Sequence, residues 1–368
     1  MSMHFRMILS LVAVGASLTA PRPAASQSVE RNVERWAETV AAAAERLAAR
    51  IERQANELAD RIEWELTDKQ SRHRRSRIRD DALGDEGRVL PSQAQRIDTT
   101  FAFSPGGTVD LTSVYGDIVV TGWDRKEAHV KAWTDRGRLD YDFSSSRLTI
   151  EHNLQRERGS WRSRDTDMRY ELSVPRGARL TLHTTSGDIE VRNTGGEVEA
   201  NSTSGDVTLE DVAERVDVGT VSGDISLRRV KGNIEANAVS GSVEASDIAG
   251  DIKLESTSGD LTVTNARGRV VELSTTSGEV SYAGDVDASG RYEFHSHSGT
   301  IDVAIPAGTS ARFSVETFSG EIDSDFPIVL QPGDRTSKRP RRFEFTIGSG
   351  GPRIIAESFS GDVEIRKR

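Results

Sequence analysis

Residues 184–209 read TTSGDIEVRNTGGEVEANSTSGDVTL, and Thr185-Ser186-Gly187-Asp188 near the start of this stretch returns as Thr203-Ser204-Gly205-Asp206. The glycine of a Ser-Gly-polar-aliphatic motif recurs along the chain at Gly187, Gly205, Gly223, Gly241, Gly259, Gly278, Gly299, Gly320 and Gly361. The first five glycines are evenly spaced and give an 18-residue period, whereas the later steps are longer and the last is the longest. A fixed period of this length is typical of a solenoid, in which each repeat is one coil stacked on the previous coil.

Weaker copies of the turn lie halfway between the main glycines, at Gly196, Gly232, Gly250 and Gly268. Apolar and polar residues alternate between the turns, as in Ile189-Glu190-Val191. Half a period accommodates a strand of about five residues and a corner of about four. The pattern predicts an all-β parallel solenoid with 18-residue coils and two strands per coil. An extra residue at Val270-Val271 explains why the step from Gly259 to Gly278 is longer by one, as a bulge would. An antiparallel array of short hairpins is the alternative.

The repeated Ser-Gly-Asp residues are predicted to be structural turn residues. Glycine accepts the positive φ of a tight corner, and an Asp side chain can accept hydrogen bonds from neighbouring backbone amides. The residues assigned this role are Ser186, Gly187, Asp188, Ser204, Gly205, Asp206, Ser222, Gly223, Asp224, Ser258, Gly259 and Asp260. A calcium ladder is the alternative, but Ser, Thr, Asn and Arg replace the carboxylate in several coils, which disfavours dense carboxylate coordination.

The segment before the repeats is predicted to have three parts. Residues 1–26 have a cationic start, an apolar run and small residues before Gln27, which indicates a secretory signal peptide. Residues 27–70 place apolar side chains three and four positions apart, which predicts a long amphipathic α-helix able to self-associate over 29–66. Residues 71–96 read as a charged linker, and the basic patch at 72–79 has no assigned role. The solenoid is expected over 97–368.

Within the solenoid, regular repeats are expected over residues 181–323, with a loop or cap near 326–342. The segments Val109-Asp110-Leu111, Tyr115-Gly116-Asp117-Ile118 and Leu172-Ser173-Val174-Pro175, with the Thr-Thr-Ser-Gly-Asp-Ile repeats, resemble the DUF4097-type β-strand-repeat family, provisionally described as adhesins. The resemblance covers about residues 97–368 and implies a β-solenoid of the bacterial envelope or surface. It implies no catalytic residues.

Composition narrows the function further. The chain has no cysteine, which excludes disulfides and thiolate chemistry, and a net charge of −10, which disfavours nucleic-acid binding. We find no nucleophile-base motif and predict no catalytic, cofactor-binding or metal-binding residues. His295 and His297 are two positions apart and share one face of a strand, but two histidines alone are weak evidence for a metal site. The serines of the repeat fit a stacked corner better than a nucleophile.

The sequence therefore predicts a non-catalytic exported protein with an adhesion, scaffold or binding role, and no cofactor. Its expected location is the periplasm, the outer membrane surface or the medium. The expected partner is an unidentified envelope component, polysaccharide or protein, and not a nucleic acid. Two alternatives stay open, namely a β-helical polysaccharide-active enzyme and an envelope-stress signalling module acting through the N-terminal helix.

Overall fold

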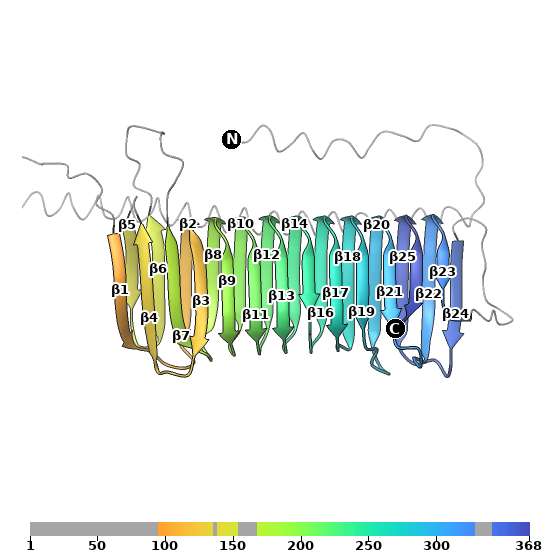
Figure 1. The fold of residues 1–368 in the computed structure, drawn as a ribbon, viewed down its shortest axis with the longest axis horizontal. Helices are drawn as coiled ribbons and strands as arrows, with labels where there is room; N and C mark the ends of the chain where they lie inside the picture. Colours follow the sequence, from red (N-terminus) through yellow and green to blue (C-terminus); the bar gives the residue numbers. More distant parts are fainter. Residues whose placement is uncertain (1–94, 135–137, 154–167, 328–340) are drawn as a thin grey trace, which may run out of the picture.

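In the middle of the chain, successive strands alternate between two sheets, so that one strand of each sheet makes one coil (Figure 1). The computed structural model describes residues 95–134, 138–153, 168–327 and 341–368. Each sheet has 13 strands, and we name them sheet A and sheet B.

Sheet A contains, in spatial order, β1 (Gln95–Ala102), β4 (Glu127–Thr134), β7 (Arg169–Pro175), β3 (Asp117–Trp123), β9 (Ile189–Thr194), β11 (Val207–Val212), β13 (Ile225–Val230), β15 (Val243–Ser246), β17 (Leu261–Ala266), β19 (Val280–Gly284), β21 (Ile301–Ile305), β26 (Val363–Lys367) and β23 (Ile322–Ser324). Sheet B contains, in spatial order, β24 (Arg341–Ile347), β22 (Ala311–Ser319), β25 (Arg353–Ser360), β20 (Arg291–Ser298), β18 (Val270–Ser277), β16 (Ile252–Ser258), β14 (Ile234–Ser240), β12 (Val216–Ser222), β10 (Val198–Ser204), β8 (Arg179–Ser186), β2 (Thr108–Tyr115), β6 (Arg147–Asn153) and β5 (Arg138–Phe143).

The register between coils follows the sequence period. Val198 of β10 lies opposite Val216 of β12, and Val216 lies opposite Ile234 of β14, so partners in these parallel strands are one period apart in the sequence. The next coils pair Ile252 with Val271, one position more than a period, so the coil of β18 holds one additional residue. This parallel pairing rules out the alternative array of antiparallel hairpins for the middle coils.

The core is the narrow layer between the two sheets. Inward side chains are mostly Val, Ile, Leu and Ala, and those of the middle coils are almost completely buried. Short β-branched side chains suit such a layer, because they fill the space between pleated surfaces without forcing the sheets apart. Larger rings are buried outside the regular middle coils, as Tyr170 is near one end and Tyr282, Tyr292 and Phe294 are in the longer coils.

The coils at both ends of the stack depart from sequence order (Figure 1). The C-terminal strand β25 lies between β20 and β22, and β26 lies between β21 and β23. At the opposite end, β2 and β3 pair with β8 and β9, while β6 and β7 lie outside them. Antiparallel pairing is confined to these ends, where it involves β1, β4, β5 and β24. Neither rearrangement was predicted from the sequence.

The predicted fold class is wrong in its helical part. The described residues form strands and contain no helix, and the segment 27–70 on which the helix was predicted lies outside them. The spacing of apolar residues indicates only that a helix would be amphipathic, not that it is stable. A single amphipathic segment gains most of its helical stability from the surface on which it packs. In the described part of the chain there is also no helix long and apolar enough to cross a membrane. The predicted signal peptide at 1–26, the basic patch at 72–79 and most of the linker likewise lie outside the described residues.

Candidate functional site

The repeated glycines stack directly on one another at the corner that leads from sheet B to sheet A. Gly205 and Gly223 have φ values of +150° and +157°. A Cβ on Gly223 would lie 2.2 Å from the carbonyl oxygen of Gly205, and one on Gly205 would lie 2.1 Å from that of Gly187. Because the obstructing atom is backbone in each case, only glycine fits without moving a coil.

The stacking of these corner glycines also shows the spatial order of the coils, which differs from the sequence order at both ends. A Cβ on Gly187 would lie 2.2 Å from the carbonyl oxygen of Gly116, which is far earlier in the chain. At the other end, Gly361 stacks on Gly299, and Gly320 stacks on Gly361. The long sequence gaps between Gly116 and Gly187 and between Gly320 and Gly361 are therefore single steps in space.

The aspartates that follow the glycines bond to the next coil. The side chain of Asp188 accepts a hydrogen bond from the backbone amide of Asp206 at 2.9 Å, and that of Asp206 accepts one from Asp224 at 2.8 Å. Asp224 continues the series to Ser242, whose hydroxyl oxygen accepts from the amide of Asp260 at 3.3 Å. Each link joins neighbouring coils, so this ladder runs along the long axis of the molecule.

The serines before the glycines, Ser204, Ser222 and Ser258, have exposed side chains, and that of Ser186 is half-buried. The structure therefore brings the twelve predicted residues together along one edge of the stack, with Ser contributing backbone and Asp contributing side chain.

Two further ladders escaped the sequence analysis. Buried hydroxyls three positions before the corner glycine donate to the glycine carbonyl of the preceding coil, as Ser256 does to Gly241 at 3.2 Å. The other members are Ser202, Thr220, Thr275, Ser296, Ser358 and Thr317. At the end of the sheet A strands, the residues Asn193, Asp211, Arg229, Asp247 and Asn265 have φ between 52° and 58°. Their regular spacing at the repeat period and their Asn and Asp content were the available signal.

The outer face of sheet B carries one carboxylate on each strand from β10 to β22, at one or the other of two outward positions, and we call this row the acidic stripe. Its members are Glu199, Asp217, Glu235, Glu255, Glu272, Glu293, Glu316 and Glu357. At these two outward positions of the strands from β10 to β22, Lys253 is the one lysine or arginine among the described residues. Strand spacing of about 4.8 Å brings the members close enough to act on one bound group.

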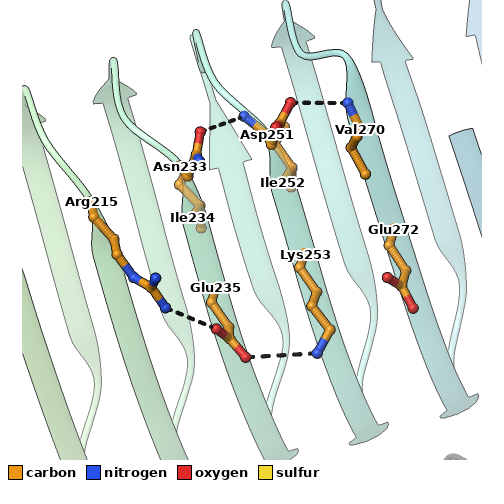
Figure 2. A pocket seen from close by; sticks show the side chains of 9 residues that line it. All are labelled: Arg215, Asn233, Ile234, Glu235, Asp251, Ile252, Lys253, Val270 and Glu272. Atoms are coloured by element: carbon orange, nitrogen blue, oxygen red, sulfur yellow. Dashed lines mark hydrogen bonds and ion pairs between the residues drawn. The ribbon is translucent and has the colours of Figure 1, made fainter. Parts of the chain in front are cut away.

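A shallow groove of about 250 Å³ crosses the acidic stripe over β14, β16 and β18 (Figure 2). Its lining residues are Arg215, Asn233, Ile234, Glu235, Asp251, Ile252, Lys253, Val270 and Glu272. Within it, the guanidinium of Arg215 lies 3.2 Å from one carboxylate oxygen of Glu235, and the ammonium of Lys253 lies 3.6 Å from the other. Each cation thus contacts the same carboxylate from a different side.

The acidic stripe favours positive charge at Lys253. Partial burial lowers the pKa of this ammonium, but the carboxylates of Glu255, Glu235 and Glu272 together outweigh the burial and raise the pKa above its ordinary value. Lys253 is therefore a cation that forms salt bridges with Glu235 and Glu255 and is also attracted by the more distant Glu272.

The additional residue of the β18 coil shapes one wall of the groove. Val270 is 44% exposed, although it is a large apolar side chain. The carboxylate of Asp251 accepts from the backbone amides of both Arg269 and Val270, at 3.1 and 3.0 Å, which fixes the widened corner. The groove therefore combines an apolar wall with acidic side chains.

A second polar cluster lies at the C-terminal end of the same face. His295 of β20, Glu357 of β25 and Glu316 of β22 lie opposite one another, and His295 Nδ1 is 3.6 Å from a carboxylate oxygen of Glu357. Burial lowers the pKa of His295 and raises the pKa of both carboxyls. The described residues contain no group of three or more ligands that could hold a metal ion. Next to this row, the ring of Phe359 stacks between two others: its centroid lies 4.9 Å from that of His297 and 5.0 Å from that of Phe318.

The fold and this face define a class: a parallel β-solenoid with capped ends and a flat, polar, repetitive outer surface. The model of the Toastrack DUF4097 family matches residues 139–247 and 198–366, which together are more than half of the chain. The chain belongs to the Toastrack DUF4097 family, and the resemblance seen in the sequence is confirmed.

Solved structures give weaker likenesses. A Parabacteroides distasonis protein, provisionally described as lipid binding, is 14% identical, with coverage of 75% of this chain and 97% of that chain and a TM-score of 0.33. A Bacteroides fragilis protein, provisionally described as an adhesin, is 13% identical, with coverage of 74% and 97% and a TM-score of 0.31. A Clostridium sporogenes protein, provisionally described as a cell adhesion protein, is 10% identical, with coverage of 74% and 100% and a TM-score of 0.21. No curated protein matches the chain.

Proposed function

We propose that this protein is a non-catalytic binding protein of the bacterial cell envelope or cell surface, and that it contacts its partner through the acidic stripe of sheet B. The observation that carries the proposal is the repetition of carboxylates at equivalent outward positions on successive coils. A surface that repeats at a fixed spacing is suited to a partner that is itself extended and repetitive, such as a polysaccharide or an extended protein segment.

Multiple weak contacts are the expected source of affinity. A single exposed ion pair contributes about 0–1 kcal/mol, so one carboxylate binds little. Several carboxylates along one axis act together once the partner spans them, because each further contact is intramolecular. We therefore expect a partner with amino or hydroxyl groups that spans three or more coils, and binding that weakens as ionic strength rises.

The test compares two faces of the same molecule. Sheet B is changed by Glu235→Gln with Glu272→Gln, and the matched control changes sheet A by Glu190→Gln with Glu244→Gln. Each protein is sedimented with isolated envelopes of the source bacterium lacking the endogenous protein. We expect the sheet B variant to bind at least about tenfold more weakly, since two of the stripe's charges are gone. Equal loss in both variants, or in neither, would remove sheet B from the proposal.

Location requires a separate experiment. The apolar run and small residues before Gln27 support export with cleavage of residues 1–26. Cell fractionation followed by N-terminal sequencing of the mature protein should find it in the envelope or the medium, starting at Gln27. Recovery from the cytoplasm with Met1 intact would contradict the envelope function.

A further inference from the structure

The groove over β14, β16 and β18 has a surplus of negative charge. Arg215 and Lys253 are bonded to Glu235, while Asp251 and Glu272 add two more carboxylates. No hydrogen bond or salt bridge of the Glu272 carboxylate occurs among the described residues; its relation to Lys253 is a longer-range attraction. Figure 2 shows Glu272 beside Lys253 on the neighbouring strand, with no dashed line to the other residues drawn.

The wall beside this carboxylate is apolar. Val270 is 44% exposed at the start of the same strand, two positions before Glu272. A side chain that combines an aliphatic stem with a terminal cation matches both features, because the stem covers Val270 while the cation reaches Glu272. Arginine and lysine are the side chains of this kind.

The acidic stripe already binds cations in this way elsewhere. The guanidinium of Arg342 lies 3.4 Å from Glu316 and 2.7 Å from Glu344, so that one arginine contacts two carboxylates of neighbouring strands. Arg291 lies 2.7 Å from Glu293, on the strand next to Glu272. Contact between an arginine and a carboxylate thus recurs on this face.

We propose that the arginine-rich segment 72–79 of this same chain docks in the groove and along the acidic stripe. The segment reads RHRRSRIR, in which five of the eight letters are arginine. Its charge complements the carboxylates of the stripe, and Ile78 supplies an apolar side chain for the exposed Val270 wall. This inference goes beyond the proposed function, because it assigns the basic segment a role in covering the binding face.

The connecting chain is long enough for this contact. Gln95, where the described residues begin, accepts a hydrogen bond through its side chain from the amide of Leu139 in β5, at 2.9 Å. From β5 to β18, which carries Val270, sheet B crosses eight strand spacings, which is about 38 Å, and the strand length adds about 20 Å at right angles. The diagonal is about 43 Å, whereas the chain from Ile78 to Gln95 spans up to about 56 Å when extended.

Docking within one chain makes the basic segment a competitor of any outside partner. A tethered segment acts at an effective concentration in the millimolar range, so a partner of the acidic stripe must displace it or bind after it leaves. Salt weakens the docking and so exposes the face.

Cysteine cross-linking tests the contact directly, because the natural chain has no cysteine. The full chain carries Ile78→Cys with Val270→Cys, and the matched control carries Ile78→Cys with Thr264→Cys on the outer face of sheet A. Disulfide formation requires Cα atoms within about 7 Å, so cross-linking reports close approach. We expect a cross-link within one chain for the 78–270 pair, at least about tenfold less for the control, and a similar loss when Arg74, Arg75 and Arg77 are changed to Glu.

Three results would overturn the proposal: equal cross-linking of both pairs, none for either pair, or a 78–270 cross-link only between two chains, which would assign the contact to a second copy. The readout needs no external partner, so it fails or succeeds independently of the binding function proposed above.

Discussion

At the residue scale, two glycines four positions apart in one coil obey different constraints. A Cβ on Gly219 would come closest to the side-chain oxygen of Asn201, at 2.7 Å, whereas one on Gly223 would meet the backbone oxygen of Gly205 at 2.2 Å. The end of a side chain can move aside, but the backbone of a stacked coil cannot. The same residue type is thus replaceable on the sheet face and irreplaceable at the corner.

We expect Gly223→Ala to lower the free energy of unfolding by at least about 2 kcal/mol, since it adds a steric clash to an unfavourable φ. Gly219→Ala should change the free energy of unfolding by less than about 1 kcal/mol in either direction. Urea denaturation of the two variants beside the natural protein measures both values. A Gly223→Ala variant as stable as Gly219→Ala would show that the corner can widen freely.

The buried hydroxyl ladder is interrupted in the middle coils at Ala238. Thr220 and Ser256 donate to the carbonyls of Gly205 and Gly241, and the coil between them has Ala238 at the equivalent position. Ala238→Ser should restore a donor for the carbonyl of Gly223 and raise the free energy of unfolding by about 1 kcal/mol.

The matched control is Ala236→Ser, two positions earlier on the same strand. Its neighbours at this position are Val218 and Leu254, so a hydroxyl there would have no acceptor, and we expect a loss of about 1–3 kcal/mol. Thermal denaturation of both variants decides the matter, and a loss of stability in Ala238→Ser would refute the ladder as a net stabilising feature.

At the scale of elements, the row across β20, β25 and β22 links titration to the inserted strand. Glu357 lies on β25, flanked by His295 on one side and Glu316 on the other. Burial raises the pKa of Glu357; Glu293 adds to this effect, whereas Arg342 and Arg353 oppose it. A carboxyl whose pKa is higher in the folded state binds its proton more tightly there, so its ionisation destabilises the fold as pH rises through the raised pKa.

We therefore expect Glu357→Gln to raise the melting temperature relative to the natural protein at pH 7, and this gain to shrink as the pH falls toward about 4. The lost ion pair with His295 should matter little at pH 7, because burial lowers the pKa of that imidazole and keeps it neutral. Calorimetry of both proteins across this range gives the difference. A gain that grows on acidification would reverse the assigned direction.

At the scale of the whole molecule, the coil of β25 and β26 separates two coils that precede it in sequence. A chain that ends at Gly351 lacks this coil, so β20 has no parallel neighbour on its C-terminal side and β23 has no pairing partner at all. We expect hydrogen exchange to accelerate strongly over residues 311–324 in this truncated chain, while the middle coils at 198–258 keep their protection. Unchanged protection of residues 311–324 would mean that the coil of β22 and β23 pairs directly with the coil of β20 and β21 in the truncated chain.

The fold of the middle coils could be predicted from the sequence because each coil repeats the same corner motif and the same alternation of apolar and polar residues. Gly205 and Gly223 sit at a fixed period, and that period corresponds to one step of the stack. The ends could not be predicted in the same way. The long step from Gly320 to Gly361 was visible, but a long loop and an inserted coil leave the same gap in a periodic pattern.

The candidate site was less accessible to sequence reasoning. Glu235, Lys253 and Glu272 come together only because three coils are in register, and each alone resembles any other outward charged residue of a strand. The additional residue at Val270 was noted as a bulge, but its effect depends on the corner that Asp251 holds open. Motifs report local chemistry, whereas this groove arises from the stacking.

The inserted C-terminal coil also imposes an order on biosynthesis. Strands β25 and β26 leave the ribosome after β22 and β23, yet β22 and β23 need them as neighbours. The nascent chain can stack its middle coils while translation continues, but this end of the stack stays incomplete until β25 and β26 have been made. This end of the solenoid is therefore completed after the middle coils, whichever compartment the chain enters.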